Sequence, residues 1–272
     1  MFKIVIFIPA HNEEKTIDLV IEDIKKIYSN SQIDILVIDD GSTDRTAPLS
    51  KVKGATVISH PYNRGLGAST RTGMQRALEM GADIVVKIDA DNQHDVKDIL
   101  KVIEPIMNDK ADVVFGSRFL GGLKYKMPFY RNIGNKFFTW LVRKLTGLKI
   151  TDGQTGLMAF HKRYLEKFNI ISDYNETQQL IVDAWRKNFR IIEVPVTFRK
   201  RESGKSFISF RYPFKVIPTL VRLFMQSDPL KFFIILGVIL SACGLYFRMD
   251  ATMMTGVLLI FFGFLIDAIG NK

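Results

Sequence analysis

Short apolar runs alternate with longer amphipathic segments along the first 120 or so residues of the chain. The apolar runs end at proline, glycine or clustered polar residues, as buried strands do. The predicted strands cover residues 3–8, 33–38, 56–59, 83–86 and 112–116. Strands that alternate with helices in this way indicate βαβ units, so the sequence predicts an α/β fold whose mostly parallel sheet carries helices on both faces.

Helices are predicted after each of the first four strands. The first helix runs to about Tyr28, and the second follows the turn at residues 39–44. The third ends at Met80, and the fourth covers residues 95–108. Asn12 is predicted to cap the first helix, and Ser42 or Thr43 the second, because their side chains can accept hydrogen bonds from exposed backbone N–H groups. His94 is expected at the start of a surface helix.

Polar clusters follow four of the predicted strands. They cover residues 9–13, 39–40, 63–67 and 89–93. In open α/β sheets the ligand lies beyond the carboxyl ends of the strands. The four clusters are therefore predicted to meet at one crevice.

Asp89 and Asp91 directly follow the fourth strand. In an extended chain residues i and i+2 point to the same side, so these carboxylates are predicted to lie side by side. A divalent cation such as Mg²⁺ or Mn²⁺ would relieve their repulsion and bind substrate phosphate oxygens at its other positions. The alternative for an isolated pair of this kind is a solvated strand end.

The spacing of the glycines restricts which class of nucleotide site the sequence can contain. Neither G-x-G-x-x-G after the first strand nor G-x-x-x-x-G-K-[ST] is present, so a usual dinucleotide site and a P-loop are not supported. Asp39 and Asp40, beyond the second strand, can bind ribose hydroxyls or a base edge. With a cation on Asp89 and Asp91, this predicts a nucleoside diphosphate that carries a transferable group.

The C-terminal region has a different pattern. Residues 230–247 and 251–270 are two apolar runs, and each is close to the ~20 residues that cross a bilayer. Arg248, Met249 and Asp250 leave room for a hairpin turn alone. Two transmembrane helices with both ends on one side are predicted, and a buried core hairpin is the alternative.

The formal net charge of +10 predicts a polyanionic partner, for which nucleic acid, anionic lipid and a phosphorylated substrate are all candidates. Residues 129–148 and 210–225 mix aromatic with basic side chains, as segments in a lipid headgroup layer do. Membrane lipid therefore accounts for the charge without nucleic acid. The single cysteine, Cys243, excludes a disulfide framework within the chain.

Residues 8–14, 39–44, 63–67 and 89–94 together resemble the serial signatures of family 2 glycosyltransferases with the GT-A fold. Residues 116–119, 128–131, 152–156, 193–196 and 199–206 are similar to the branch that uses polyprenyl or dolichyl phosphate, the dolichyl-phosphate-mannose-synthase-like enzymes. The resemblance covers about residues 1–210. It departs at His11, where the family more usually has tyrosine, and at residues 174–179, where the family is more acidic.

The resemblance implies roles for named residues. The nucleotide would be bordered by Pro9, Ala10, Asn12, Glu13, Asp39, Asp40, Gly65 and Asp89. Mg²⁺ or Mn²⁺ would be held by Asp89, Asp91 and Gln93. The acceptor phosphate would be bound by Arg118, Arg131 and Arg201, and the donor sugar or acceptor region by Asp152, Gln154 and Gln178. Asp89, Asp91, Arg118 and Arg131 would form the catalytic set. The alternatives are a turn for Asp152 and Gln154, and a solvated face for the charge run 199–205.

The implied activity is inverting transfer of a hexose or N-acetylhexosamine from GDP-mannose, UDP-glucose or UDP-N-acetylglucosamine to polyprenyl phosphate. Chemistry supports such an acceptor, because a phosphomonoester is already anionic at neutral pH and needs no general base. Two alternatives are a processive polysaccharide synthase, whose Gln-x-x-Arg-Trp motif is absent, and a catalytically silent scaffold.

The expected organisation has three parts: a catalytic domain at 1–209, an interface helix at 210–227 and two membrane helices at 230–270. The protein would be a multi-pass protein of the cell membrane or an endomembrane, with the catalytic domain on the cytoplasmic face. The sequence leaves open the nucleotide, the sugar, the polyprenol and the oligomeric state.

Overall fold

The computed structural model describes residues 2–29, 32–121, 129–200, 218–219, 221–225 and 228–270. Arg201 and most of the aromatic and basic segment predicted at 210–225 lie outside these residues. The chain forms two compact units, Met1–Pro213 and Phe214–Lys272.

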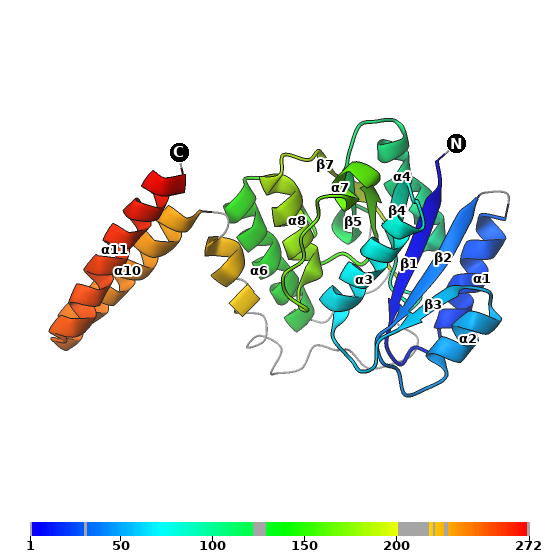
Figure 1. Ribbon diagram of the computed structural model, residues 1–272, viewed down its shortest axis with the longest axis horizontal. Helices are drawn as coiled ribbons and strands as arrows, with labels where there is room; N and C mark the ends of the chain where they lie inside the picture. Colours follow the sequence, from blue (N-terminus) through cyan, green and yellow to red (C-terminus); the bar gives the residue numbers. More distant parts are fainter. Residues whose placement is uncertain are drawn as a thin grey trace. The chain divides into compact units, whose positions relative to one another are not determined.

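The first unit is built on a seven-stranded sheet with the strand order β3-β2-β1-β4-β6-β5-β7 (Figure 1). The strands are β1 (Ile4–Ala10), β2 (Ile33–Asp39), β3 (Thr56–Ser59), β4 (Ile84–Lys87), β5 (Val113–Ser117), β6 (Met158–His161) and β7 (Ile191–Pro195). β1 pairs in parallel with β2 and β4, and β2 with β3. β6 runs antiparallel to both β4 and β5, whereas β5 and β7 are parallel. The predicted, mostly parallel sheet is confirmed.

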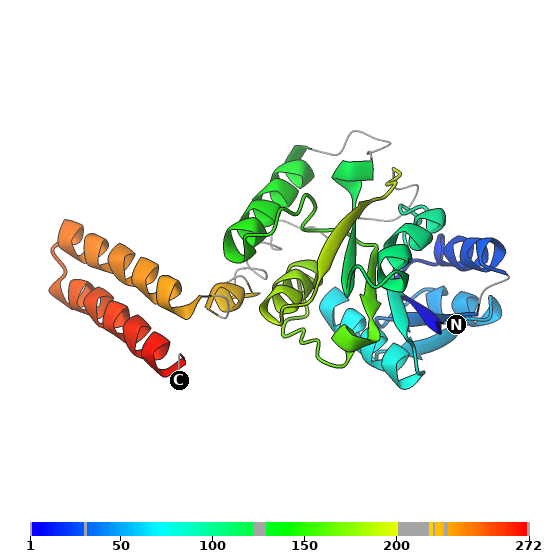
Figure 2. The same ribbon diagram turned by 90° about the horizontal axis from the view of Figure 1, so that it is seen from above.

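Helices flank this sheet, and those that follow β1, β2, β3 and β4 are the ones that the sequence predicts. They are α1 (Ile17–Ile27), α2 (Thr46–Val52), α3 (Leu66–Glu79), the 3-10 turn η1 (Val96–Asp98), α4 (Ile99–Met107), α5 (Arg118–Gly121), α6 (Phe129–Thr146), α7 (Lys162–Leu165) and α8 (Glu176–Arg186). The views of Figures 1 and 2 place α3 and α4 on opposite faces of the sheet. Helices therefore cover both faces, as predicted.

Two predicted helix caps are wrong. Asn12 has a left-handed backbone (φ 55°) and lies in a loop, and α1 begins only at Ile17. Arg45 occupies the N-cap of α2, so neither Ser42 nor Thr43 caps that helix. These polar side chains instead form hydrogen bonds between the loop after β1 and the loop after β2. Such contacts compete with local capping.

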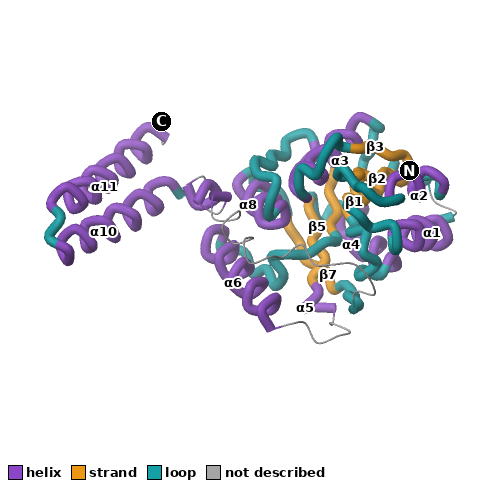
Figure 3. Tube along the Cα trace, turned by 90° about the horizontal axis from the view of Figure 1, so that it is seen from below, coloured by secondary structure: helices purple, strands orange, loops and turns teal. Residues whose placement is uncertain are grey.

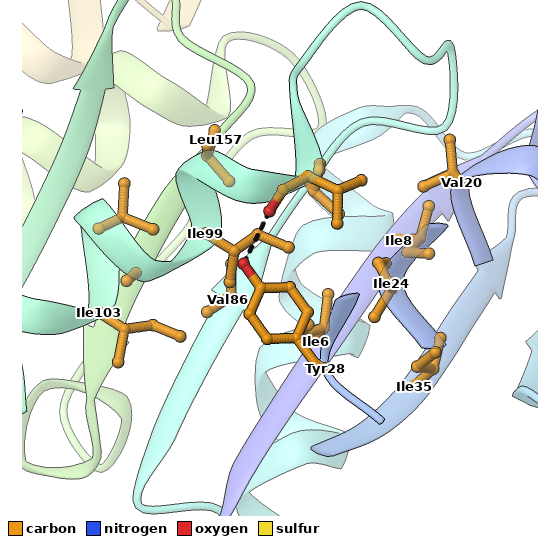
Figure 4. Packing of buried hydrophobic residues seen from close by; sticks show 14 of the residues in the cluster. Ile6, Ile8, Val20, Ile24, Tyr28, Ile35, Val86, Ile99, Ile103 and Leu157 are labelled. Atoms are coloured by element: carbon orange, nitrogen blue, oxygen red, sulfur yellow. Dashed lines mark hydrogen bonds between the residues drawn. The ribbon is translucent and has the colours of Figure 1, made fainter. Parts of the chain in front are cut away.

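The core alternates across β1 in the way that strand geometry requires. Ile6 and Ile8 join a buried cluster with residues of α1 and α4 (Figure 4). Phe7 points to the other face and contacts α3, where a Cβ on Gly73 would lie 2.4 Å from the Phe7 ring. Both faces of β1 are therefore buried, which explains its unbroken apolar run.

The second unit contains α10 (Pro229–Phe247) and α11 (Asp250–Gly270), which run side by side (Figure 3). The two helices are long and apolar enough to cross a membrane, with mean hydropathies of 2.2 and 1.9. Arg248 makes the turn between them in a left-handed conformation. Glycines bring the helices close, since a Cβ on Gly237 would lie 2.5 Å from the Gly256 carbonyl oxygen. Small residues are typical of closely packed membrane helices.

One hydrogen bond joins α1 to η1 inside the core. The Tyr28 hydroxyl, just beyond α1, donates to the Val96 carbonyl over 2.9 Å (Figure 4). Burial raises the pKa of Tyr28 to about 12, so the hydroxyl keeps its proton at neutral pH.

We expect Tyr28→Phe to lower the free energy of unfolding by about 1 kcal/mol, because the buried Val96 carbonyl loses its donor. Thermal unfolding in detergent should show a midpoint about 2–4 °C lower. Tyr62→Phe is the matched control, since Tyr62 is exposed and its substitution should leave the midpoint unchanged. An equal shift in both variants would contradict this account.

Candidate active site

The loops after β1 and β2 are tied together by hydrogen bonds. Asn12 Oδ1 accepts from the Thr43 backbone N–H (2.8 Å), and the Asn12 N–H donates to Ser42 Oγ (3.0 Å). The Glu13 N–H donates to Thr46 Oγ1 over 2.8 Å. This connection holds the loop after β1 in a fixed position beside the loop after β2.

Several predicted nucleotide residues lie together at this edge of the sheet. Pro9 and Ala10 end β1, and Ala10 lies opposite Asp39 in the register with β2. Asp39 is buried, and its carboxylate accepts the Ser42 N–H over 3.1 Å. The structure thus brings Pro9, Ala10, Asn12, Glu13 and Asp39 to one edge.

Asp40 shapes the next loop. Its Oδ1 accepts from the Arg64 N–H (3.0 Å) and lies 2.7 Å from His60 Nδ1, and its Oδ2 accepts from the Gly65 N–H (2.8 Å). Gly65 has φ 101°, a conformation that favours glycine, and opens α3. Both oxygens of this buried carboxylate therefore organise the loop at residues 60–65, which also contains predicted nucleotide residue Gly65.

A buried lysine contacts Asp89, one of the predicted metal ligands. Lys87, the last residue of β4, is completely buried, and its Nζ lies 2.7 Å from Asp89 Oδ1. The same Nζ lies 3.6 Å from Glu176 Oε1, in the first turn of α8. The Asp89 side chain keeps 32% of its surface exposed. One ammonium group thus lies between a partly exposed carboxylate and a buried carboxylate.

Lys87, Asp89 and Glu176 shift one another's pKa values. Burial lowers the pKa of Lys87, but the Asp89 and Glu176 carboxylates more than offset this, so the pKa is raised. Burial raises the pKa of Asp89, yet Lys87 and its other neighbours hold that pKa below its usual value. Burial also raises the pKa of Glu176, which Lys87 only partly offsets. Lys87 and Asp89 are therefore an ion pair at neutral pH.

Gly156 packs directly against the Asp89 carboxylate. A Cβ at position 156 would lie 1.8 Å from Asp89 Oδ2 and 2.9 Å from His94 Nε2. No side chain fits there without moving Asp89. The segment before β6 therefore determines where the carboxylate points.

Asp91 and Gln93 complete the predicted metal set. Asp91 Oδ1 accepts the Gln93 N–H over 3.2 Å, and the Gln93 side-chain amide donates to the Arg199 carbonyl over 2.8 Å. The described residues contain no group of three or more His, Cys, Asp or Glu side chains that could hold a metal. Two carboxylates and one amide oxygen fit an oxygen-binding cation that takes its other ligands from a substrate diphosphate.

Arg118 and Asp152 form a buried bidentate pair. Arg118 Nε and one terminal nitrogen donate to the two Asp152 oxygens over 2.6 and 2.8 Å, and the guanidinium stacks over Phe198 at 5.0 Å. Asn135 Nδ2 of α6 also donates to Asp152, over 2.9 Å. Burial raises the pKa of Asp152, but the Arg118 guanidinium keeps it below its usual value.

The predicted sugar or acceptor residues also converge here. The Gln154 carbonyl accepts from Arg118 over 2.7 Å, and Gln178 of α8 donates to the Gly153 carbonyl over 2.7 Å. Gln178 is almost completely buried. The structure thus groups Arg118, Asp152, Gln154 and Gln178 around residues 152–154. Arg131 lies in α6 with a side chain outside the described atoms, and Arg201 lies outside the described residues.

Sequence reasoning missed three residues of the site. The expectation that His94 lies on the surface is wrong, because the residue is only 2% exposed. Its ring centroid lies 4.9 Å from that of Phe198. Burial lowers its pKa to about 4. Lys87 could have been noticed as a charge at the end of an apolar strand, on the same side as Asp89. Glu176 gave no local signal, because tertiary packing alone brings it to Lys87.

The α/β sheet therefore carries ordered loops and acidic side chains at the ends of its parallel strands. Residues 5–168 match the family model for glycosyl transferase family 2. The chain belongs to this family, and it is a glycosyltransferase of the hexosyltransferase class.

Two relatives illustrate the branch. The chain is 34% identical over 217 residues to UDP-N-acetylglucosamine--dolichyl-phosphate N-acetylglucosaminyltransferase of Methanococcus voltae, covering 71% of this chain and 84% of that protein. It is 29% identical over 215 residues to polyprenol monophosphomannose synthase of Mycolicibacterium smegmatis, covering 75% and 80%. The predicted resemblance to this family and branch is confirmed.

The fold is also found in solved structures. Glucosyl-3-phosphoglycerate synthase from Mycobacterium tuberculosis, in complex with Mn²⁺ and UDP-glucose, matches with a TM-score of 0.65 at 22% identity. The match covers 82% of this chain and 79% of that one. The predicted GT-A fold is thereby confirmed.

We expect Gly156→Ala to lower sugar transfer about 100-fold, since displacing a reacting group by about 1 Å has this effect. The added methyl group must push Asp89 out of position. Gly134→Ala is the matched control, because a Cβ there meets nothing within 4 Å. Transfer rates of both purified variants, with unfolding midpoints as a check on folding, test this. Full activity of Gly156→Ala would show that the position of Asp89 is unimportant.

Proposed function

We propose that the protein transfers a hexose or N-acetylhexosamine from a nucleoside diphosphate donor to polyprenyl or dolichyl phosphate. The observation that carries this proposal is the pair Asp89 and Asp91, at the end of β4 beside the connected loops after β1 and β2. The named activities of the two relatives support a lipid phosphate as the acceptor.

The reaction proposed is a direct displacement with inversion. An oxygen of the acceptor phosphate forms a bond to the anomeric carbon, the bond from that carbon to the donor diphosphate breaks, and nucleoside diphosphate leaves. Because the acceptor is already anionic, no side chain needs to remove a proton. The nucleotide would be held by Pro9, Ala10, Asn12, Glu13, Asp39, Asp40, Gly65 and Asp89.

Asp89, Asp91 and Gln93 would hold Mg²⁺ or Mn²⁺, which when bound supplies positive charge to the departing diphosphate. The Mn²⁺ in the matched synthase structure supports such a metal. Arg118, Arg131 and Arg201 would bind the acceptor phosphate. For Arg118, the bidentate contact with Asp152 would fix the orientation of the guanidinium, so that Asp152 is a positioning residue.

We expect the purified protein, with Mn²⁺ and a short polyprenyl phosphate, to move label from one of GDP-mannose, UDP-glucose or UDP-N-acetylglucosamine into the organic phase. Asp91→Asn and chelation should each reduce transfer at least ~100-fold, because the departing diphosphate loses its neutralising charge. Asp34→Asn is a matched control, since Asp34 is the second residue of β2, at the opposite edge of the sheet from Asp39, and its side chain is half exposed.

Transfer that survives Asp91→Asn would contradict the assignment of this carboxylate. Absence of transfer from every donor, with nucleotide binding intact, would favour another acceptor or a silent scaffold.

We further propose that the protein is attached to a membrane, with α10 and α11 crossing it and the first unit on the cytoplasmic side. One face of α6 supports this attachment. Phe129, Ile133, Phe137 and Trp140 are each at least half exposed and recur at helical spacing, with Lys136 and Arg143 beside them. An apolar stripe flanked by basic residues suits the headgroup layer of an anionic membrane.

Replacing Phe137 and Trp140 with serine should weaken the binding of the first unit to lipid, because α6 loses two exposed aromatic side chains. We expect a fragment of residues 1–200, if it remains folded by circular dichroism, to float with anionic vesicles, and the double variant to float about tenfold less. Leu100→Ser, on the exposed face of α4, is the control. Equal flotation of all three fragments would contradict a membrane role for α6.

A further inference from the structure

Lys87 is the completely buried cation of the site, and nothing in the proposed reaction requires it. Its contact with Asp89 Oδ1 (2.7 Å) is shorter than its contact with Glu176 Oε1 (3.6 Å). Its Nζ also lies 3.5 Å from the Gly156 carbonyl oxygen. The ammonium is thus surrounded by acceptors, and it lies on the side of Asp89 away from solvent.

Two physical effects follow from this placement. A buried positive charge repels a divalent cation that approaches Asp89, and the repulsion is little screened because water is absent. The same charge attracts the diphosphate of a donor. Without Lys87, Asp89 would lose its counter-ion, and its carboxylate would attract a free cation more strongly.

We propose that Lys87 is a positioning residue that sets the order of binding: it keeps the empty site weak for a free divalent cation and favours the nucleoside diphosphate, so that metal enters with or after the nucleotide. This inference rests on the proposed metal and nucleotide site. Lys87 also holds Asp89 Oδ1, and Gly156 packs against Oδ2, so both oxygens have fixed positions before any substrate binds.

The test compares two variants that differ at Lys87 alone. Lys87→Met by itself would leave Glu176 buried without a cationic partner, which is strongly destabilising. The pair compared is therefore Glu176→Gln and the double variant Lys87→Met with Glu176→Gln. Circular dichroism verifies that both full-length variants are folded in detergent.

Two affinities are measured for each variant: Mn²⁺ without nucleotide, from the electron paramagnetic resonance signal of free Mn²⁺, and UDP or GDP in the presence of chelator, by calorimetry. Removing Lys87 should tighten Mn²⁺ binding about tenfold and weaken nucleotide binding about fivefold. These changes have opposite signs, whereas simple structural damage would weaken both affinities.

The inference is overturned if both affinities weaken together or if neither changes. A different result tests the proposed function itself: if the unaltered protein binds Mn²⁺ no better with either nucleotide than without, the metal site fails, and the role of Lys87 fails with it. If nucleotide does strengthen Mn²⁺ binding but Lys87 has no influence, the metal site stands and only the ordering role is lost.

Discussion

The ion pair between Lys87 and Asp89 is the interaction on which the site is built. It lies at the end of the central strand β4, where β1 and β6 cover both sides and water has no access to the ammonium. A buried charge needs partners, so α8 must bring Glu176 to it and the segment before β6 must bring the Gly156 carbonyl. One lysine thereby links β4, α8 and Gly156, the residue that packs against the Asp89 carboxylate.

The sequence was sufficient for the first half of the sheet because its signals are local. Strands β1, β2 and β4 are buried on both faces, so each appears as an apolar run, and the following polar residues mark the crevice edge. Strands β6 and β7 were not predicted, and both pair with strands that are distant in sequence, β6 with β4 and β5, and β7 with β5. Pairing between strands that are distant in sequence depends on tertiary structure, and a local pattern of apolar residues cannot predict it.

The same distinction applies to the candidate site. The grouping of Asp39 with Asn12 follows from strand order, whereas the side-by-side placement of Asp89 and Asp91 stays a prediction, because residues 90 and 91 lie in a turn beyond β4. The wrong assignments, Asn12 as a cap and His94 on the surface, concern side chains whose partners are remote. Asn12 bonds to a loop about 30 residues away, and His94 packs on Phe198. Local propensity cannot predict such competition.

The reversed direction of β6 divides the candidate site into two halves. Because β6 runs against its neighbours, the residues that precede it, 152–156, emerge at the same edge as the residues that follow β4 and β5. The parallel strands β1, β2 and β3 supply one half of this edge, and the region around β6 supplies the other. Under the proposed function, the acceptor specificity can change in the second half while the nucleotide half stays intact, because the two halves come from different segments of one continuous sheet.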